Sequence, residues 1–100
     1  MTFSYVVRSE FDDPDLAEAY SAWLVGGHLE EVCRLGGATA ELVRIDAPLP
    51  TFEARYAFPS RDAFAAYERD HAPRLRAEGV AKFGAGRFAR STGDRLFASR

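Results

Sequence analysis

The sequence lacks the marks of a secreted, disulfide-bonded or membrane-spanning chain. Cys33 is the only cysteine, so no intrachain disulfide can form. Residues 1–8 contain no basic segment followed by an apolar run, which a signal peptide would require. No stretch approaches the roughly 20 apolar residues that span a bilayer. We therefore expect a cytoplasmic protein with no membrane partner.

A strong excess of one charge is also absent. The formal net charge is -2, and this near balance excludes the basic surface that binds nucleic acid. Lys82 is the only lysine, and the other basic residues are arginines, whose planar guanidinium pairs well with carboxylates. The short segment Gly84-Ala85-Gly86 lacks the lysine and the following helix of a phosphate-binding loop.

The length of 100 residues fits one domain, 1–100, with no internal boundary or linker. A monomer of this size buries only about two-thirds of the surface of its unfolded chain. Association with a second copy would therefore add to its stability.

Four segments show the alternation of apolar and polar residues that is typical of strands. The clearest is Thr51–Phe58, where Phe52, Ala54, Tyr56 and Phe58 point to one side. The predicted strands are Thr2–Arg8, Ala38–Asp46, Thr51–Phe58 and a shorter Arg87–Thr92.

A first helix is predicted from Pro14 to about Leu35. Asp13 is a good N-cap, and Pro14 suits the first helical position because its missing N–H would have no partner there. Gly26-Gly27 in the middle predicts a kink or a close backbone approach, since each glycine costs about 1 kcal/mol relative to alanine. Gly36-Gly37 is a C-cap signal.

A second helix begins after Ser60, the predicted N-cap, and Gly79 closes the segment. Pro73 removes a backbone hydrogen bond, so we expect the helix to stop near His71 and restart, or to bend there. The inward stripe is formed by residues three or four apart, namely Phe64, Tyr67, His71 and Leu75.

The order β-α-β-β-α-β predicts an α+β, ferredoxin-like plait, in which a four-stranded antiparallel sheet carries both helices on one face. The other face mixes apolar residues (Val6, Ala57) with arginines (Arg8, Arg55). A second protomer packed on this face would explain the mixture, and closed two-fold dimers are the commonest oligomers. We predict a homodimer through the sheet.

The segments YAFPSRDAFAAYERDHAPRLRAEG and GHLEEV resemble an uncharacterised family of short bacterial proteins in the dimeric α/β-barrel superfamily. This resemblance implies the two-sheet dimer and a small-molecule cavity between helices and sheet. The superfamily includes cofactor-independent monooxygenases, lactone isomerases, haem-binding enzymes and proteins of no known activity. No catalytic set carries over residue by residue. The residues that carry the resemblance are His28, Leu29, Glu30, Tyr56, Phe58, His71, Ala72, Pro73, Leu75 and Arg76.

The candidate catalytic residues are His28, His71 and Tyr56. Both histidines lie on inward helical stripes, so they could meet in one pocket, and a neutral imidazole moves protons near pH 7. The competing interpretation is that both are structural, partly buried histidines. Together with Glu30 or Glu31 they could form a two-histidine, one-carboxylate metal set, but no close-spaced histidine pair supports it, and we predict no metal and no cofactor.

The candidate ligand-binding residues are Trp23, Phe64, Tyr67 and Arg55. The aromatic rings could wall a cavity for a small apolar or aromatic ligand, or form plain hydrophobic core. Arginine could bind a ligand carboxylate in a bidentate manner. Arg55, Arg61, Arg74 and Arg76 could equally form surface ion pairs, with Glu68, Asp70 and Glu78 among the partners.

Two functions remain open from the sequence. The first is a small-molecule enzyme, of the cofactor-independent monooxygenase or isomerase type, in which a histidine moves a proton. The second is a non-catalytic ligand-binding or assembly module that acts as a homodimer. Fold class alone does not decide between them.

Overall fold

The computed structural model describes residues 2–99. Its strands form one antiparallel 4-stranded sheet in the order β2-β3-β1-β4. The elements in chain order are β1 (Phe3–Glu10), α1 (Pro14–Trp23), the π-helical turn η1 (Leu24–His28), α2 (Leu29–Gly36), β2 (Thr39–Ile45), β3 (Thr51–Phe58), α3 (Arg61–Asp70), α4 (Ala72–Phe83) and β4 (Arg87–Asp94).

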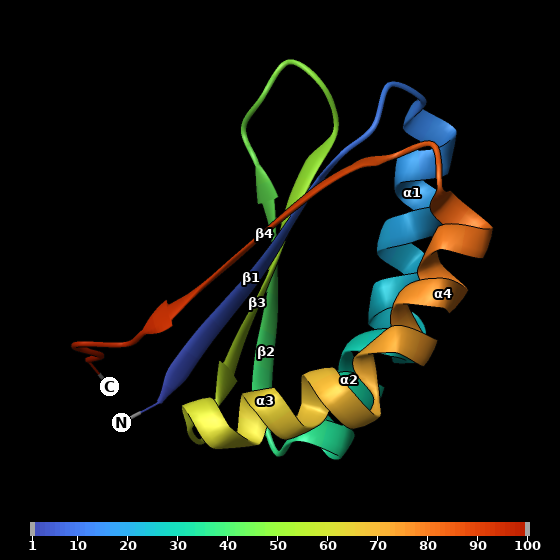
Figure 1. Ribbon diagram of the computed structural model, residues 1–100. Coiled ribbons are helices and arrows are strands. Elements are labelled where there is room, and N and C mark those ends of the chain that lie inside the picture. Colours follow the sequence, from blue (N-terminus) through green and yellow to red (C-terminus); the bar gives the residue numbers. More distant parts are fainter. Residues whose placement is uncertain (1, 100) are drawn as a thin grey trace.

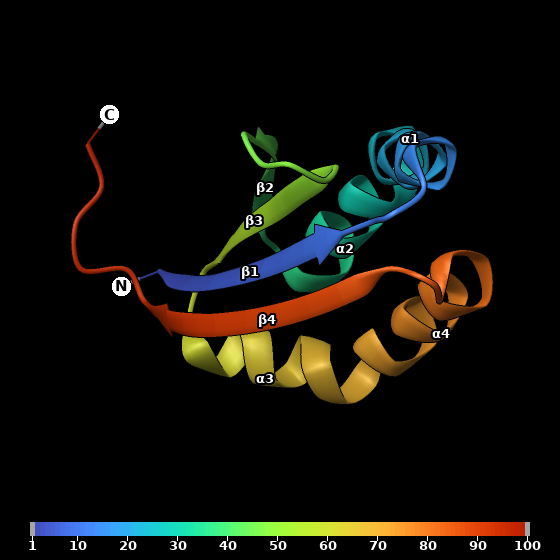
Figure 2. The same ribbon diagram turned by 90° about the horizontal axis from the view of Figure 1, so that it is seen from above.

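All the helices lie on one face of the sheet, which leaves the other face uncovered (Figures 1 and 2). The first crossover, from β1 to β2, is made by α1, η1 and α2, and the second, from β3 to β4, by α3 and α4. This arrangement is the ferredoxin-like plait, and it confirms the predicted fold class.

Alternation along the two central strands builds the core. Tyr5 lies opposite Tyr56 in the antiparallel register of β1 and β3, and their rings stack at 5.6 Å. Phe3 and Phe58, also paired in this register, are buried on the same face. Burial of each such side chain contributes about 1.5–3 kcal/mol, so this aromatic face supplies much of the driving force that holds the helices on the sheet.

The helix starts follow the predicted caps. The Asp13 carboxylate accepts hydrogen bonds from the backbone N–H groups of Asp15 and Leu16. The Ser60 hydroxyl accepts from the N–H of Ala63 at 3.0 Å. Each cap satisfies backbone donors that the first helical turn leaves without partners, and both cap predictions are confirmed.

The predicted kink in the first crossover is present and takes the form of a π-helical turn. Gly27 has φ 158° and ψ −26°, outside the helical region, and only a residue without a Cβ adopts this combination readily. The turn separates α1 from α2 and ends at His28. Gly37 ends α2 in the left-handed conformation, with φ 66° and ψ 27°, as the C-cap signal predicted.

The second crossover breaks where the sequence predicts and then runs further than expected. α3 ends at Asp70, and α4 restarts at Ala72 with Pro73 in its first turn. However, α4 passes through Gly79 and continues to Phe83, because the buried side chain of Phe83 outweighs the helical cost of one glycine, about 1 kcal/mol.

The last strand is also longer than predicted and reaches Asp94. It pairs with the whole of β1, with Phe3 opposite Asp94. Asp94 forms an ion pair with Arg61 at 3.2 Å, which joins the end of the strand to the start of α3.

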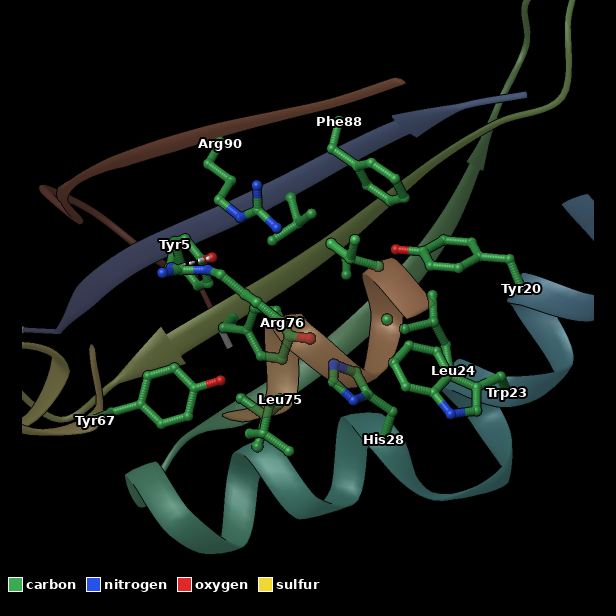
Figure 3. Close-up of a pocket in the computed structure, with 16 residues that line it drawn as sticks. Tyr5, Tyr20, Trp23, Leu24, His28, Tyr67, Leu75, Arg76, Phe88 and Arg90 are labelled. Carbon is green, nitrogen blue, oxygen red and sulfur yellow. Dashed lines mark hydrogen bonds between the residues drawn. The ribbon is translucent and has the colours of Figure 1, made fainter. Parts of the chain in front are cut away.

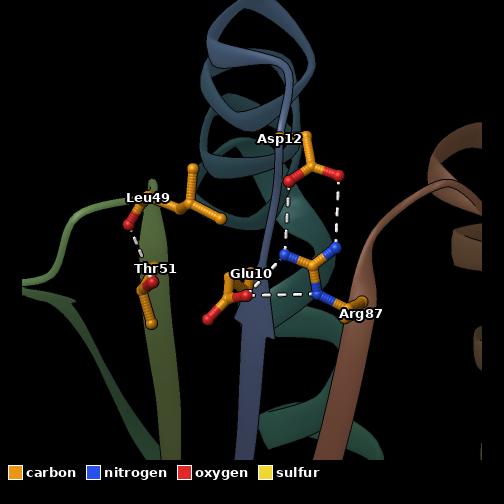
Figure 4. A network of polar contacts seen from close by, with 5 residues as sticks. All are labelled: Glu10, Asp12, Leu49, Thr51 and Arg87. Carbon is orange, nitrogen blue, oxygen red and sulfur yellow. Dashed lines mark hydrogen bonds and ion pairs between the residues drawn. The ribbon is translucent and has the colours of Figure 1, made fainter.

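Ion pairs lie on the face of the sheet that no helix covers, and also at one end of the sheet. Arg8 and Arg55 both bond to Glu53 at 2.9 Å. At the end of the sheet where β1 finishes and β4 begins, the Arg87 guanidinium bridges Glu10 and Asp12 (Figure 4). Exposed pairs of this kind contribute only about 0–1 kcal/mol each, so they fix side-chain positions more than they stabilise the fold.

Among the helices of residues 2–99, none has the length and apolar content needed to cross a bilayer.

Gly36 gives a test of the core. A Cβ at this position would lie 2.3 Å from the Phe58 ring, which is far inside van der Waals contact. We expect Gly36→Ala to lower the free energy of unfolding by about 1–3 kcal/mol, as overpacked cores do, measured by urea denaturation. The matched control is Gly26→Ala, where a Cβ meets nothing within 4 Å and the free energy should stay unchanged or rise by up to about 1 kcal/mol. Equal effects of the two substitutions would contradict this packing.

Candidate functional site

A cavity lies between the helices and the covered face of the sheet (Figure 3). Its volume is ≈ 70 Å³. One water needs about 10–15 Å³, so this volume corresponds to about five water molecules. The lining comes from β1, α1, η1, α2, β3, α3, α4 and β4. An apolar protein cavity that holds benzene measures about 150 Å³, so a single ring would fill this cavity and protrude from it, and a larger ring system would protrude further.

Phenol groups form the polar part of the interior. Tyr56 lies on the sheet side of the cavity, and Tyr20 and Tyr67 reach it from the helices. Burial, followed by the neighbouring Tyr67, raises the pKa of Tyr56 far above its usual value. Burial also raises the pKa of Tyr20 and raises that of Tyr67 to about 12. All three phenols are therefore neutral near pH 7 and can act as hydrogen-bond donors.

Tyr20 also faces the hydroxyl of Ser9, which lies beneath it on β1. Contact with Ser9 lowers the pKa of Tyr20, against the larger effect of burial. The Ser9 Oγ is buried and has no well-aligned hydrogen bond within residues 2–99.

His28 is the only titratable nitrogen base that lines the cavity among residues 2–99. Its ring stacks on Trp23, with 4.1 Å between ring centroids and 23° between the planes. Burial lowers the pKa of His28, and Glu31 and Glu78 oppose this shift. The imidazole is therefore neutral near pH 7 and can accept a proton.

The π-helical turn explains how His28 reaches the cavity. It adds a residue to one helical turn, and such bulges occur often at functional sites. Trp23 ends α1, and His28 ends the turn, so the two stacked rings face the cavity from either side of the bulge.

Two arginines complete the lining. Arg76, on α4, donates hydrogen bonds to the Tyr5 hydroxyl at 3.2 Å and to the Glu68 carboxylate at 2.6 Å. Arg90 comes from β4 and lies opposite Val7 of β1. Figure 3 shows its side chain directed from the strand toward the cavity.

The structure brings together four of the residues singled out from the sequence. His28, Tyr56, Trp23 and Tyr67 all line the cavity. Their roles in binding or catalysis remain predictions.

The other three candidates lie elsewhere. His71 does not line the cavity; it occupies the break between α3 and α4 with φ −129° and ψ −37°, so the helical stripe is lost before it. Its ring centroid is 6.4 Å from that of Tyr67. Phe64 packs in the core against Phe3, at 5.1 Å. Arg55 projects from the uncovered face of the sheet, where Glu53 binds it.

Sequence reasoning missed Tyr5, Tyr20 and Arg90 as cavity residues. Tyr20 was visible in the helical stripe and Tyr5 in the alternation of the first strand. For Arg90 the signal was its two-residue spacing from Phe88, an apolar residue of the same predicted strand. The surface ion-pair interpretation holds for Arg61 and Arg74, which pair with Asp94 and with Glu31 and Glu78.

Within residues 2–99, no three histidine, cysteine or carboxylate side chains gather closely enough to hold a metal ion. The candidate metal set of both histidines with Glu30 or Glu31 is therefore not assembled in this part of the chain. Cys33 is partly buried, and burial raises the pKa of its thiol, which disfavours the reactive thiolate.

The sheet order, with all helices on one face, gives the chain a ferredoxin-like fold. No protein-family model matches the sequence, and no curated protein does so either. Solved structures do match in fold.

Three of these structures illustrate the likeness. A dimeric ferredoxin-like protein from an uncultured marine organism matches with a TM-score of 0.75 and 11% identity over 98% of both chains. SnoaB, a cofactor-independent oxygenase from Streptomyces nogalater, matches with a TM-score of 0.69 and 14% identity over 97% of this chain and 95% of SnoaB. A candidate antibiotic biosynthesis monooxygenase from Deinococcus radiodurans matches with a TM-score of 0.74 and 9% identity over 100% of this chain and 97% of its own. At these identities the likeness establishes the fold.

The lowered pKa of His28 gives a test of its environment. We expect its ring signals to titrate below the reference value of about 6.5 in NMR spectra. The unfolded chain then binds this proton more readily than the folded chain, so the stabilisation is present above about pH 6.5 and is lost as the pH falls below it. Denaturation of wild type and His28→Gln, compared at about pH 7 and pH 5, should show a smaller loss for the variant. Titration of His28 above the reference value would contradict its burial.

Proposed function

We propose that the protein is a small-molecule enzyme of the cofactor-independent monooxygenase or isomerase type, with His28 as the group that moves a proton. The observation that carries the proposal is the neutral imidazole of His28, stacked on Trp23 in a mostly apolar cavity. The fold shared with SnoaB, a cofactor-independent oxygenase, supports the same class of chemistry.

The first step is the same for both reaction types. His28 takes a proton from an acidic C–H bond of the substrate, and the electron pair of that bond remains on the substrate as an enolate or phenolate-like anion. The protonated phenols of Tyr56 and Tyr67 line the same cavity and can donate hydrogen bonds to the oxygen on which the charge develops. The mostly apolar lining lowers the local dielectric constant, which strengthens these interactions.

The two reaction types differ in the next step. In an isomerisation, the protonated His28 returns the proton to another carbon of the substrate. In an oxygenation, O₂ is the oxidant and the substrate anion the reductant: a CH₂ group and O₂ give a hydroperoxide, which loses water to leave a ketone.

Proton abstraction can be tested without knowledge of the natural substrate. Phenylacetone is a neutral, single-ring ketone with an acidic benzylic C–H bond, and its exchange with D₂O is followed by NMR. We expect the wild-type chain to accelerate this exchange. His28→Gln should lower the enzymatic rate by about 10²–10⁴-fold, as expected for loss of a general base.

His71→Gln is the matched control for this experiment, because His71 lies outside the cavity lining. We expect it to leave the exchange rate unchanged. Binding of phenylacetone without accelerated exchange would instead support the alternative, a non-catalytic ligand-binding module. Equal losses in both histidine variants would contradict the assignment of proton transfer to His28.

We also propose that two copies associate through the uncovered face of the sheet. Val6, Val43 and Ile45 are only partly exposed there, and the arginines of this face are already paired within the protomer. A facing sheet would therefore meet a surface whose charges are balanced. The fold neighbours described as dimeric support this association.

Sedimentation tests the dimer. We expect the wild-type chain to sediment as a dimer at micromolar concentration. Val6→Glu, on the central strand of the uncovered face, should shift it to monomer by placing an unpaired charge in the interface. Val25→Glu serves as control, because Val25 is 67% exposed on the helical side and should leave the dimer intact. A monomeric wild type would refute the proposal.

A further inference from the structure

We propose that Arg90 is an anion receptor at the mouth of the cavity, and that the ligand is a single-ring aromatic carboxylate. This inference deepens the proposed function, since it names the class of molecule that would occupy the same cavity. It depends on the charge, position and size of the site.

The charge around the cavity is unbalanced. Two arginines line it, whereas none of its lining residues is an aspartate or a glutamate. Arg76 is neutralised by Glu68 at 2.6 Å. Within residues 2–99, Arg90 has neither an ion pair nor a side-chain hydrogen bond, whereas Arg87 of the same strand pairs with Glu10 and Asp12.

Arg90 is on the helix-facing side of β4. It is two residues from Phe88, which packs against the core, and it is opposite Val7, which also packs against the core. Its positive charge is close enough to affect the phenols of the interior: it opposes the rise in pKa that burial causes in Tyr20 and Tyr67. A guanidinium placed here without a carboxylate is arranged to receive one from a ligand.

The opening of the cavity lies between α4 and β4. Val80, on α4, lines the cavity and is 63% exposed. Arg90, on β4, is also exposed. A ligand that enters here places its acid group near the solvent beside Arg90, and its apolar end inside. Such an arrangement avoids the high cost of burying an ionised carboxylate away from water.

The interior can take at most part of one aromatic ring. The volume of ≈ 70 Å³ is about half of the roughly 150 Å³ that holds benzene in an apolar protein cavity, so a single ring would enter from the mouth and extend into it. The rings of Trp23, Phe88 and Tyr56 line the cavity. Aromatic pairs are stabilised by about 0.5–1.5 kcal/mol beyond the burial of apolar area. The guanidinium of Arg90 attracts an anion, and no lining carboxylate offsets it, so we expect the site to favour an anionic ring compound over a neutral or cationic one.

Binding of three single-ring ligands tests the inference. Phenylpyruvate carries the carboxylate, phenylacetone is its neutral analogue, and phenyl phosphate distinguishes a phosphate receptor from a carboxylate receptor. Calorimetric titration of the full chain should show phenylpyruvate bound at least about 10-fold more tightly than phenylacetone. Phenyl phosphate should bind more weakly than phenylpyruvate.

Arg90→Gln should weaken phenylpyruvate binding by about 10- to 100-fold, the range for a hydrogen bond to a charged group, and leave phenylacetone binding unchanged. Arg90→Lys keeps the charge without the planar fork and should retain part of the preference. Arg34→Gln, the same substitution on an exposed residue of α2 outside the cavity, should bind like wild type. Thermal melting checks that each variant is folded.

The inference is overturned if phenylacetone binds wild type as tightly as phenylpyruvate, or if the preference survives in Arg90→Gln. Tighter binding of phenyl phosphate, or no binding of any of the three ligands at about 1 mM, also overturns it. These outcomes are independent of proton transfer: binding with the expected preference but without deuterium exchange would refute the enzyme proposal alone.

Discussion

The stacked contact between Tyr5 and Tyr56 is the interaction on which both the core and the cavity depend. The register of β1 and β3 sets these residues opposite each other, and their rings lie 5.6 Å apart. Toward one end of the strands the aromatic face closes into a core around Phe58. Toward the other, the cavity lies between the sheet and the helices. One aromatic face thus stabilises the fold and provides the floor of the site, so large substitutions at Tyr56 would affect both.

The π-helical turn is the second constraint, because it separates the packing role of the first crossover from its chemical role. α1 buries Ala17 and Tyr20, and α2 buries Val32. Between them, Gly27 leaves the helical conformation, and His28 stacks on Trp23. A regular helix through this segment would be weakened by Gly26 and Gly27, since glycine is a poor helix former. Glycine also tolerates the conformation of the turn, so the chain bends at the point where His28 meets the cavity.

The sequence predicted the fold well where a local signal had one structural solution. Caps at Asp13 and Ser60, the glycine kink and the alternation of Thr51–Phe58 all appear in the structure. The site was predictable only in part. His71 has the spacing of the inward helical stripe, but α3 ends at Asp70, so His71 does not continue that stripe into the cavity. Arg55 and Tyr56 are both site candidates, but adjacent residues of a strand point to opposite faces of the sheet. The alternation of Thr51–Phe58 therefore already indicates that they cannot line the same cavity.

Arg90 was only partly predictable, for a different reason. Its two-residue spacing from Phe88 indicates the side of the strand on which it lies. Its neighbours follow from the register of β4 against β1, a long-range pairing that no local pattern fixes. The same register explains why Arg90, unlike the arginines of the uncovered face, has no carboxylate opposite it. On the uncovered face, arginines and glutamates alternate across neighbouring strands and neutralise one another. On the covered face, the opposite strand offers Arg90 an apolar neighbour, Val7. Among residues 2–99, no carboxylate pairs with the guanidinium of Arg90. The carboxylate of the proposed ligand would take that place, with its charge still near solvent.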